Sequence, residues 1–137
     1  MKEAVVYFSR NGHSKKIANA IAASFGIQAL DLGSSPQLDN VDMLYVVGGI
    51  YANTNDPKML TAIKELDAAK VKKAVLVTSC VSKRMKQDQA RQTLQQKGIE
   101  VVTDEYVCQG SFLFIGMGHP NQAELDEAVS FAKKIAQ

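Results

Sequence analysis

The sequence has few cysteines and no long apolar run. Both shortages narrow the class of protein to which it can belong. Cys80 and Cys108 are too few for the disulfide framework of a small secreted protein, and neither belongs to a CxxC pair of the kind that binds zinc. No apolar run approaches the roughly 20 residues of a membrane-spanning helix. The chain also enters a predicted strand soon after Met1, without a signal-peptide core. We therefore expect a cytoplasmic protein with no membrane span.

The motifs of several phosphate-handling enzymes are missing as well. The sequence contains neither the GxxxxGK[ST] run of nucleoside triphosphatases nor the GxGxxG fingerprint of dinucleotide-binding folds. Phospho-receiver domains need acidic residues at the ends of their first and third strands, where this chain has Phe8-Ser9 and Gly48-Gly49. The first loop also lacks the cysteine of a low-molecular-weight phosphatase. A site that holds a phosphate is thus favoured over one that transfers it.

A turn from an apolar strand into an amphipathic helix is the most informative feature of the chain. The strand ends in Val5–Phe8, and the turn supplies polar or flexible residues in quick succession: Ser9, Asn11, Gly12, His13 and Ser14. The first N–H groups of a helix lack internal partners, and the peptide dipoles place partial positive charge there. The turn is therefore predicted to bind a phosphate group, and a mononucleotide cofactor is the ligand that remains after the exclusions above.

Apolar strands alternate with helices along the rest of the chain. Strands are predicted over residues 3–8, 27–31, 42–48, 73–80 and 100–109, and helices near 14–24, 57–68, 83–97 and 121–136. Segment 32–41 is too short for a crossover helix, so we expect one helical turn or an irregular connection. Asn121 and Glu124 have the spacing of a capping box. Continuous apolar strands of this kind predict an α/β fold, with a parallel sheet covered on both faces and one domain over residues 1–137.

The segment Tyr7–Ala18, with the sequence YFSRNGHSKKIA, resembles the phosphate loop of the flavodoxin family. In that family a Ser or Thr opens the loop, Gly is fourth and Thr or Ser is sixth, and they wrap the phosphate of flavin mononucleotide (FMN). Ser9, Gly12 and Ser14 match this pattern. Segment 42–51 is similar to the third strand and the loop over one face of the flavin ring. Segments 108–112 and 118–121 resemble the last loop of short flavodoxin-like proteins.

The resemblance implies a flavodoxin-like three-layer sandwich with a five-stranded parallel sheet of order 2-1-3-4-5. In such a sheet the ligand lies outside the carboxyl ends of strands one and three, where loops 9–14, 49–56 and 80–85 converge. It implies FMN as cofactor and no catalytic residue or metal. The residues assigned to FMN are Ser9, Arg10, Asn11, Gly12, His13, Ser14, Gly49, Ile50, Tyr51, Ala52, Cys80 and Ser82. Tyr51 is expected to stack on the ring, and Cys80 and Ser82 to offer backbone contacts.

The third loop and the charge depart from the pattern of many electron-carrier flavodoxins. Those proteins place glycines, an acidic residue and a stacking aromatic after strand four, whereas residues 78–86 contain no carboxylate and no aromatic. Segment 56–97 has ten Lys or Arg against four Asp or Glu, a local charge of +6 in a chain whose net charge is +2. We expect this excess on one side of the fold. It lacks the interleaved aromatics of a nucleic-acid surface, so no nucleic-acid partner is expected.

Three functions are compatible with these features. The first is an FMN-binding carrier that exchanges electrons with redox partner proteins, which the short chain favours. The second is a small FMN-dependent NAD(P)H:quinone-type reductase, which would oxidise added NADH or NADPH directly. The third is a flavin-free binding module, which the altered third loop allows. Visible absorption before and after addition of FMN separates the third function from the other two.

Overall fold

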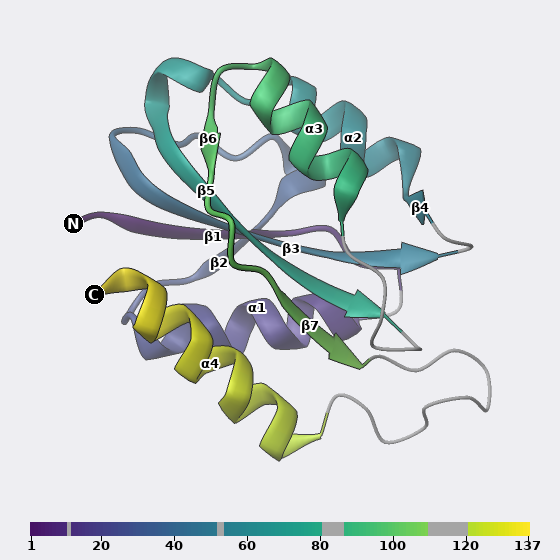
Figure 1. Cartoon of the computed structure of the whole chain (residues 1–137), viewed down its shortest axis with the longest axis vertical. Coiled ribbons are helices and arrows are strands. Elements are labelled where there is room, and N and C mark those ends of the chain that lie inside the picture. Colours follow the sequence, from purple (N-terminus) through teal and green to yellow (C-terminus); the bar gives the residue numbers. More distant parts are fainter. Residues whose placement is uncertain (11, 52–53, 81–86, 110–120) are drawn as a thin grey trace.

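A parallel sheet lies between two layers of helices (Figure 1). The computed structural model describes residues 1–10, 12–51, 54–80, 87–109 and 121–137, with the backbone alone at positions 51, 54, 80, 108 and 109. The strands are β1 (Glu3–Tyr7), β2 (Ala29–Asp31), β3 (Val41–Tyr51), β4 (Thr54–Asn55), β5 (Val71–Cys80), β6 (Glu100–Val101) and β7 (Tyr106–Gln109). The helices are α1 (His13–Ser24), α2 (Pro57–Lys64), α3 (Asp88–Gln96) and α4 (Gln122–Ala136), with short 3-10 turns η1 (Leu32–Ser34) and η2 (Ala68–Lys70).

The strands pair in the order β2-β1-β3-β5-β6, and β7 pairs with β5 further along the same edge. With β6 and β7 as two parts of the fifth strand, this is the expected order 2-1-3-4-5. Val6 lies opposite Val46, which lies opposite Leu76, so β1, β3 and β5 run in parallel and in register. The short β4 turns back antiparallel on the end of β3.

Two predicted elements are interrupted. The expected strand 100–109 breaks into β6 and β7, and the break contains Glu105, whose carboxylate bonds to α3 instead of facing solvent. The helix predicted over 57–68 ends at Lys64 because Asp67 caps the separate turn η2 through the amide of Ala69. The helix predicted over 83–97 is described from Asp88, and residues 83–86 lie outside the described part of the chain.

Two other local predictions are confirmed. In the capping box of α4, Oδ1 of Asn121 accepts a hydrogen bond from the Glu124 amide at 2.9 Å. The Asn121 amide donates in return to Oε1 of Glu124 at 3.0 Å. The segment predicted over 32–41 holds the single turn η1 and then irregular chain as far as Asn40, and Val41 begins β3.

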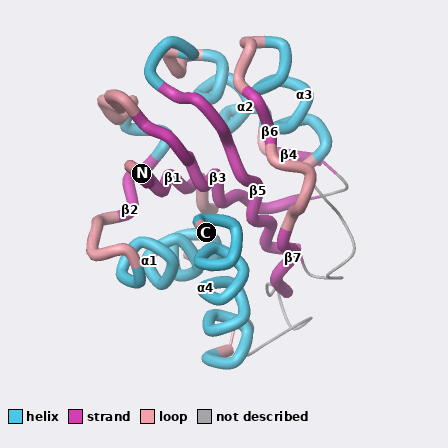
Figure 2. Tube along the Cα trace, turned by 60° about the vertical axis from the view of Figure 1, so that its left-hand side comes forward, coloured by secondary structure: helices cyan, strands magenta, loops and turns pink. Residues whose placement is uncertain are grey.

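Each face of the sheet has its own core. Helices α1 and α4 cover one face of the sheet (Figure 2). Their apolar side chains pack there on Tyr45 and Val75. Helices α2 and α3 cover the other face, where they pack on Leu44, Val46 and Leu76. Both faces of the central strands are thus removed from water, which explains why these strands are continuously apolar. Among the described residues, no helix combines the length and the apolarity needed to span a membrane.

Among the residues whose side chains are described, Tyr45 is the largest that is fully buried, and it links β3 to α4. Its hydroxyl donates to the carbonyl of Ala132 at 3.0 Å, and its ring packs on Phe25 with the centroids 5.5 Å apart. Burial raises the pKa of Tyr45 to about 12, so the phenol stays neutral and serves as a donor.

Gly48 leaves room for two buried side chains beneath the end of β3. A Cβ atom at this position would lie 2.6 Å from Sδ of Met59 and 2.8 Å from Oε1 of Gln87. Both side chains are fully buried and cannot move into solvent. Gly48 is therefore a site of close packing between β3, α2 and Gln87, with no space for a side chain.

We predict that Gly48→Ala lowers the free energy of unfolding by about 1 to 3 kcal/mol, because overpacking a closed core has a cost of that size. Urea unfolding followed by circular dichroism measures the change. Gly33→Ala is the matched control, because its Cβ would meet Asp31 Oδ1 at 3.3 Å and Phe8 Cε2 at 3.9 Å, and Asp31 is exposed. Equal stabilities for Gly48→Ala and the wild type would show that the space beside Met59 is larger than described.

Candidate functional site

The carboxyl ends of β1, β3 and β5 meet at one edge of the sheet (Figure 1). Tyr7 lies opposite Val47, and Val47 lies opposite Val77. The three chain segments that follow these strands therefore start side by side. Because parallel sheets bind ligands at this edge, next to the strand where the winding direction reverses, the candidate site is located here.

The turn after β1 has the geometry of an anion cradle. Gly12 adopts a left-handed conformation with φ of 89°, which glycine tolerates without strain, and its amide donates to Oγ of Ser9 at 2.8 Å. Gly12 is also the N-cap of α1, so no side chain caps the helix. The first hydrogen bond of α1 runs from the Lys16 amide to the Gly12 carbonyl. The preceding amides thus have no acceptor inside the helix.

Ser14 provides the strongest sign of a ligand. Its side chain is completely buried in the first turn of α1. Its Oγ atom has no hydrogen-bond partner among the described residues. Buried hydroxyls are nearly always paired, because an unpaired one costs about 1 to 3 kcal/mol. An oxygen-rich anion in the turn would supply the missing partner.

The charge around this turn also suits an anion. The first turn of α1 contains no acidic residue, and Lys15 and Lys16 are exposed. Burial and then the positive charge of Lys16 lower the pKa of His13, which begins the helix. A bound anion would oppose both effects and favour the protonated imidazole.

Arg10 contacts the neighbouring loop. Its Nε donates to Oδ2 of Asp56 at 2.8 Å, while Oδ1 of the same carboxylate accepts from the Lys58 amide and caps α2. The side chain of Arg10 is 52% exposed and that of Asp56 11% exposed. Burial raises the pKa of Asp56, but the hydrogen bonds and charges of Arg10 and Lys58 outweigh burial and lower the pKa below its usual value.

A buried amide network, which sequence reasoning missed, connects the second loop to the third. Asn55 accepts from the Ala90 amide at 3.2 Å, and its own amide donates to Oε1 of Gln89 at 3.0 Å. Its side-chain Nδ2 donates to Oε1 of Gln87 at 3.2 Å. Gln87 in turn donates to the Val77 carbonyl at 2.8 Å. The end of the second loop is thereby fixed to β5 and to the start of α3.

A buried carboxylate extends this network to the fifth strand. Oε1 of Glu105 accepts from the Gln87 amide at 2.9 Å, and Oε2 pairs with Arg91 at 3.1 Å. The Glu105 side chain is 2% exposed and that of Arg91 is 21% exposed. The sequence gives no local signal for this pair, because the partners lie on α3 and in the interruption of a predicted strand.

The other residues predicted to bind the cofactor are only partly described. Gly49 and Ile50 lie at the end of β3, with Gly49 opposite Ser79 and Ile50 opposite Asn55. The backbone of Tyr51 ends β3 and that of Cys80 ends β5, as expected of residues at this edge. Asn11, Ala52 and Ser82 lie outside the described residues, as do Lys83 and Arg84. Ring stacking by Tyr51 stays a prediction.

The basic excess of segment 56–97 is partly neutralised by carboxylates from outside that segment. The pairs are Lys70–Asp39, Lys72–Asp42 and Lys73–Glu100, each at 3.2 Å, and Arg91–Glu105 at 3.1 Å. The expectation that the excess lies on one side of the fold stays a prediction, because Lys83, Arg84 and Lys86 lie outside the described residues.

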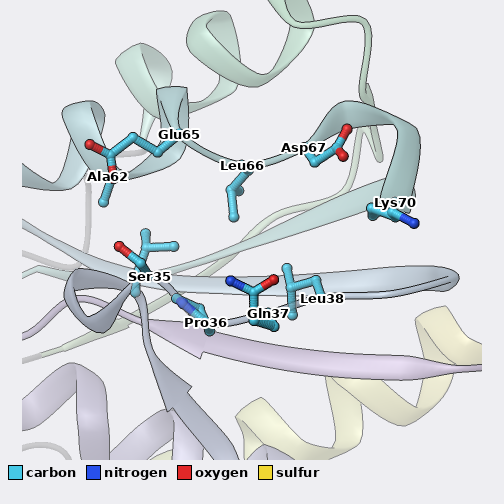
Figure 3. Close-up of a pocket in the computed structure, with 10 residues that line it drawn as sticks. Ser35, Pro36, Gln37, Leu38, Ala62, Glu65, Leu66, Asp67 and Lys70 are labelled. Carbon is cyan, nitrogen blue, oxygen red and sulfur yellow. The ribbon is translucent and has the colours of Figure 1, made fainter.

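A separate cavity of about 170 Å³ lies between the segment after η1 and the end of α2 (Figure 3). Ser35, Pro36 and Leu38 line one side, and Glu65 and Leu66 line the other. Pockets for cofactor-sized ligands usually measure roughly 300 to 1,000 Å³, so this cavity is too small for a flavin.

A family model and several solved structures match this chain. The family model described as a flavodoxin domain matches residues 4–114. No curated protein sequence matches significantly. Among solved structures, a flavodoxin from the domain Archaea has a TM-score of 0.66 at 15% identity, with 100% of each chain covered. Flavodoxin 2 from Bacillus cereus has a TM-score of 0.70 at 14% identity, with 99% of this chain and 98% of that chain covered. An NAD(P)H:quinone oxidoreductase from Methanothermobacter marburgensis has a TM-score of 0.66 at 14% identity, covering 100% and 96%. At these identities the structural likeness shows the fold alone.

We predict that Asp56→Asn lowers the free energy of unfolding at neutral pH by about 1 kcal/mol, because Arg10 is half exposed and pairs of this kind are weak. Asparagine keeps the helix cap. The pKa of the Asp56 carboxyl falls on folding, so its charge stabilises the folded state at pH values above the pKa of the unfolded chain. This stabilisation is lost as the pH falls through the pKa of the folded state. The difference between the two proteins should thus shrink below about pH 4.

Urea unfolding at a series of pH values measures this difference. Asp67→Asn is the control, because Asp67 also caps a helical turn, through the amide of Ala69, but forms no ion pair within the described part of the chain. A difference between Asp56→Asn and wild type that stays constant down to pH 2 would contradict a stabilising charge on Asp56.

Proposed function

This chain belongs to the flavodoxin domain family, and from that premise we propose that it binds FMN non-covalently and transfers electrons. The observation that carries the proposal is the buried, unpartnered hydroxyl of Ser14 in a turn whose Gly12 has the left-handed conformation. These two residues occupy the positions at which the family motif has its phosphate-binding Gly and Ser or Thr. The fit therefore rests on local geometry as well as on family membership.

The turn between β1 and α1 would hold the phosphate of FMN. Ser14 would donate its hydroxyl proton to a phosphate oxygen, and backbone amides at the start of α1 would add further donors. Ser9 already holds the Gly12 amide and thereby fixes the shape of the turn. Asn11 and His13 would complete the donor set. Bound FMN supplies the redox chemistry, while these residues bind and orient it.

The loops after β3 and β5 would flank the ring. Gly49, Ile50, Tyr51 and Ala52 would lie along one side, with Tyr51 stacked on the ring, and Cys80 and Ser82 would offer backbone contacts. The location of Gly49 and Ile50 at the carboxyl edge supports this assignment. Redox partner proteins would reach the ring from this edge, and we propose the cytoplasm as the compartment.

A reductase is the second candidate, and one observation favours it. The NAD(P)H:quinone oxidoreductase from Methanothermobacter marburgensis matches this chain over nearly its full length, with the same TM-score as the archaeal flavodoxin. A chain of this size is therefore compatible with either role. Direct oxidation of NADH or NADPH by the FMN-loaded protein would favour the reductase, whereas a stable one-electron reduced flavin without such oxidation would favour the carrier.

We predict that the protein quenches FMN fluorescence with saturable binding, and that Ser14→Ala weakens FMN binding about 10- to 100-fold. A hydrogen bond to a charged group is worth about 1.5 to 3 kcal/mol, which corresponds to that range. Riboflavin has no phosphate, so its affinity should be the same for the wild type and the variant. Fluorescence titration with both flavins measures the effect.

Ser24→Ala is the matched control, because Ser24 lies at the other end of α1 and its Oγ donates to the Ile21 carbonyl. Its FMN affinity should equal that of the wild type. A wild-type protein that leaves FMN fluorescence unchanged would refute FMN binding and favour the flavin-free binding module.

A further inference from the structure

Two adjacent residues, Asn55 and Asp56, tie three loops of the site together. Asp56 bonds to Arg10 in the loop after β1. Asn55 bonds to Gln87 and Ala90, which follow the loop after β5. Neither residue belongs to the family motif, and both are nearly buried, with 1% exposure for Asn55 and 8% for Asp56.

The Asn55 side of this junction is rigid. Asn55 and Gln87 are almost completely buried, and their amide groups bond to each other, to Ala90 and to the Val77 carbonyl. Removing any of these partners would leave a buried polar group unpaired. Asp56 follows directly in the chain and caps α2, so its carboxylate is fixed relative to β5 and α3.

The Arg10 side of the junction is exposed. The Arg10 side chain is half exposed, and its Nε donates to the fixed carboxylate at 2.8 Å. Arg10 directly follows Ser9, whose Oγ holds the Gly12 amide. The ion pair therefore ties the beginning of the phosphate turn to the second loop.

On the basis of the proposed function, we infer that Arg10 and Asp56 are positioning residues for the FMN phosphate. Their ion pair holds the turn of Ser9, Gly12 and Ser14 in its binding shape against the second loop. Arg10 contributes by orienting this turn, and not by donating its charge to the phosphate. A preformed turn spares the ordering cost on binding, so loss of the pair should weaken binding of the phosphorylated flavin selectively.

Asp56→Asn separates this role from direct phosphate binding by Arg10. If Arg10 bound the phosphate, removal of the competing carboxylate would release the guanidinium and tighten FMN binding. If Arg10 positions the turn, the same variant should weaken FMN binding, by about fivefold or more, and change riboflavin affinity by less than about twofold. Fluorescence titration with the two flavins measures both affinities.

Arg10→Gln and the double variant complete a mutant cycle. Arg10→Gln should weaken FMN binding to a similar extent, and the double variant should bind FMN no more weakly than either single variant. Arg10→Gln leaves the helix cap intact, so it tests the inference even if Asp56→Asn folds poorly. The matched control is the pair Lys72–Asp42 at the opposite edge, where Asp42→Asn and Lys72→Gln should leave both affinities unchanged.

Each other outcome overturns the inference. Tighter FMN binding by Asp56→Asn would assign Arg10 to the phosphate, and unchanged FMN affinity in both single variants would show that the pair has no role. Equal weakening of FMN and riboflavin would indicate general loosening of the site. A wild-type protein that binds neither flavin would refute the proposed function itself, whereas the other outcomes leave FMN binding intact.

Discussion

Parallel pairing of β1, β3 and β5 determines where this protein can hold a ligand. Since the three strands run in the same direction and in register, their carboxyl ends open at one edge, and the first turn of α1 begins there. Helices on both faces bury the strands and pack against them, so the positions from which the loops at this edge start are well defined. Three features that favour an anion meet in the turn between β1 and α1: the helix dipole, the left-handed Gly12 and the buried Ser14 hydroxyl.

Polar contacts beneath the loops are as well organised as the apolar core. Asn55, Gln87 and Glu105 satisfy one another or nearby backbone groups, and Arg91 balances the buried carboxylate. A fully paired network of this kind favours one arrangement, because any slip leaves buried groups without partners. The site thus combines a buried polar network with one half-exposed side chain, Arg10. Because Arg10 connects this network to the phosphate turn, preorganisation of the turn can be tested by mutation.

Sequence reasoning predicted what local patterns encode. Apolar runs located the sheet, spacing located the capping box of α4, and Ser9, Gly12 and Ser14 identified the turn after β1. It missed contacts between distant segments: Arg10 pairs with Asp56, 46 residues away, and Asn55 with Gln87, 32 residues away. Asn and Gln in such positions look like ordinary loop or helix-surface residues until the fold brings them together. The packing of Met59 and Gln87 against Gly48 was missed for the same reason, because these two side chains come from other parts of the chain.

The central claim is that the turn between β1 and α1 binds the phosphate of FMN through Ser14. Phosphorus-31 NMR of FMN, titrated with the wild-type protein and with the Ser14→Ala variant, tests it most directly. The account predicts a distinct bound phosphate resonance with the wild type that is much weaker or absent with the variant at equal concentrations. A resonance that stays at the position of free FMN with the wild type, or that shifts equally with both proteins, would contradict it.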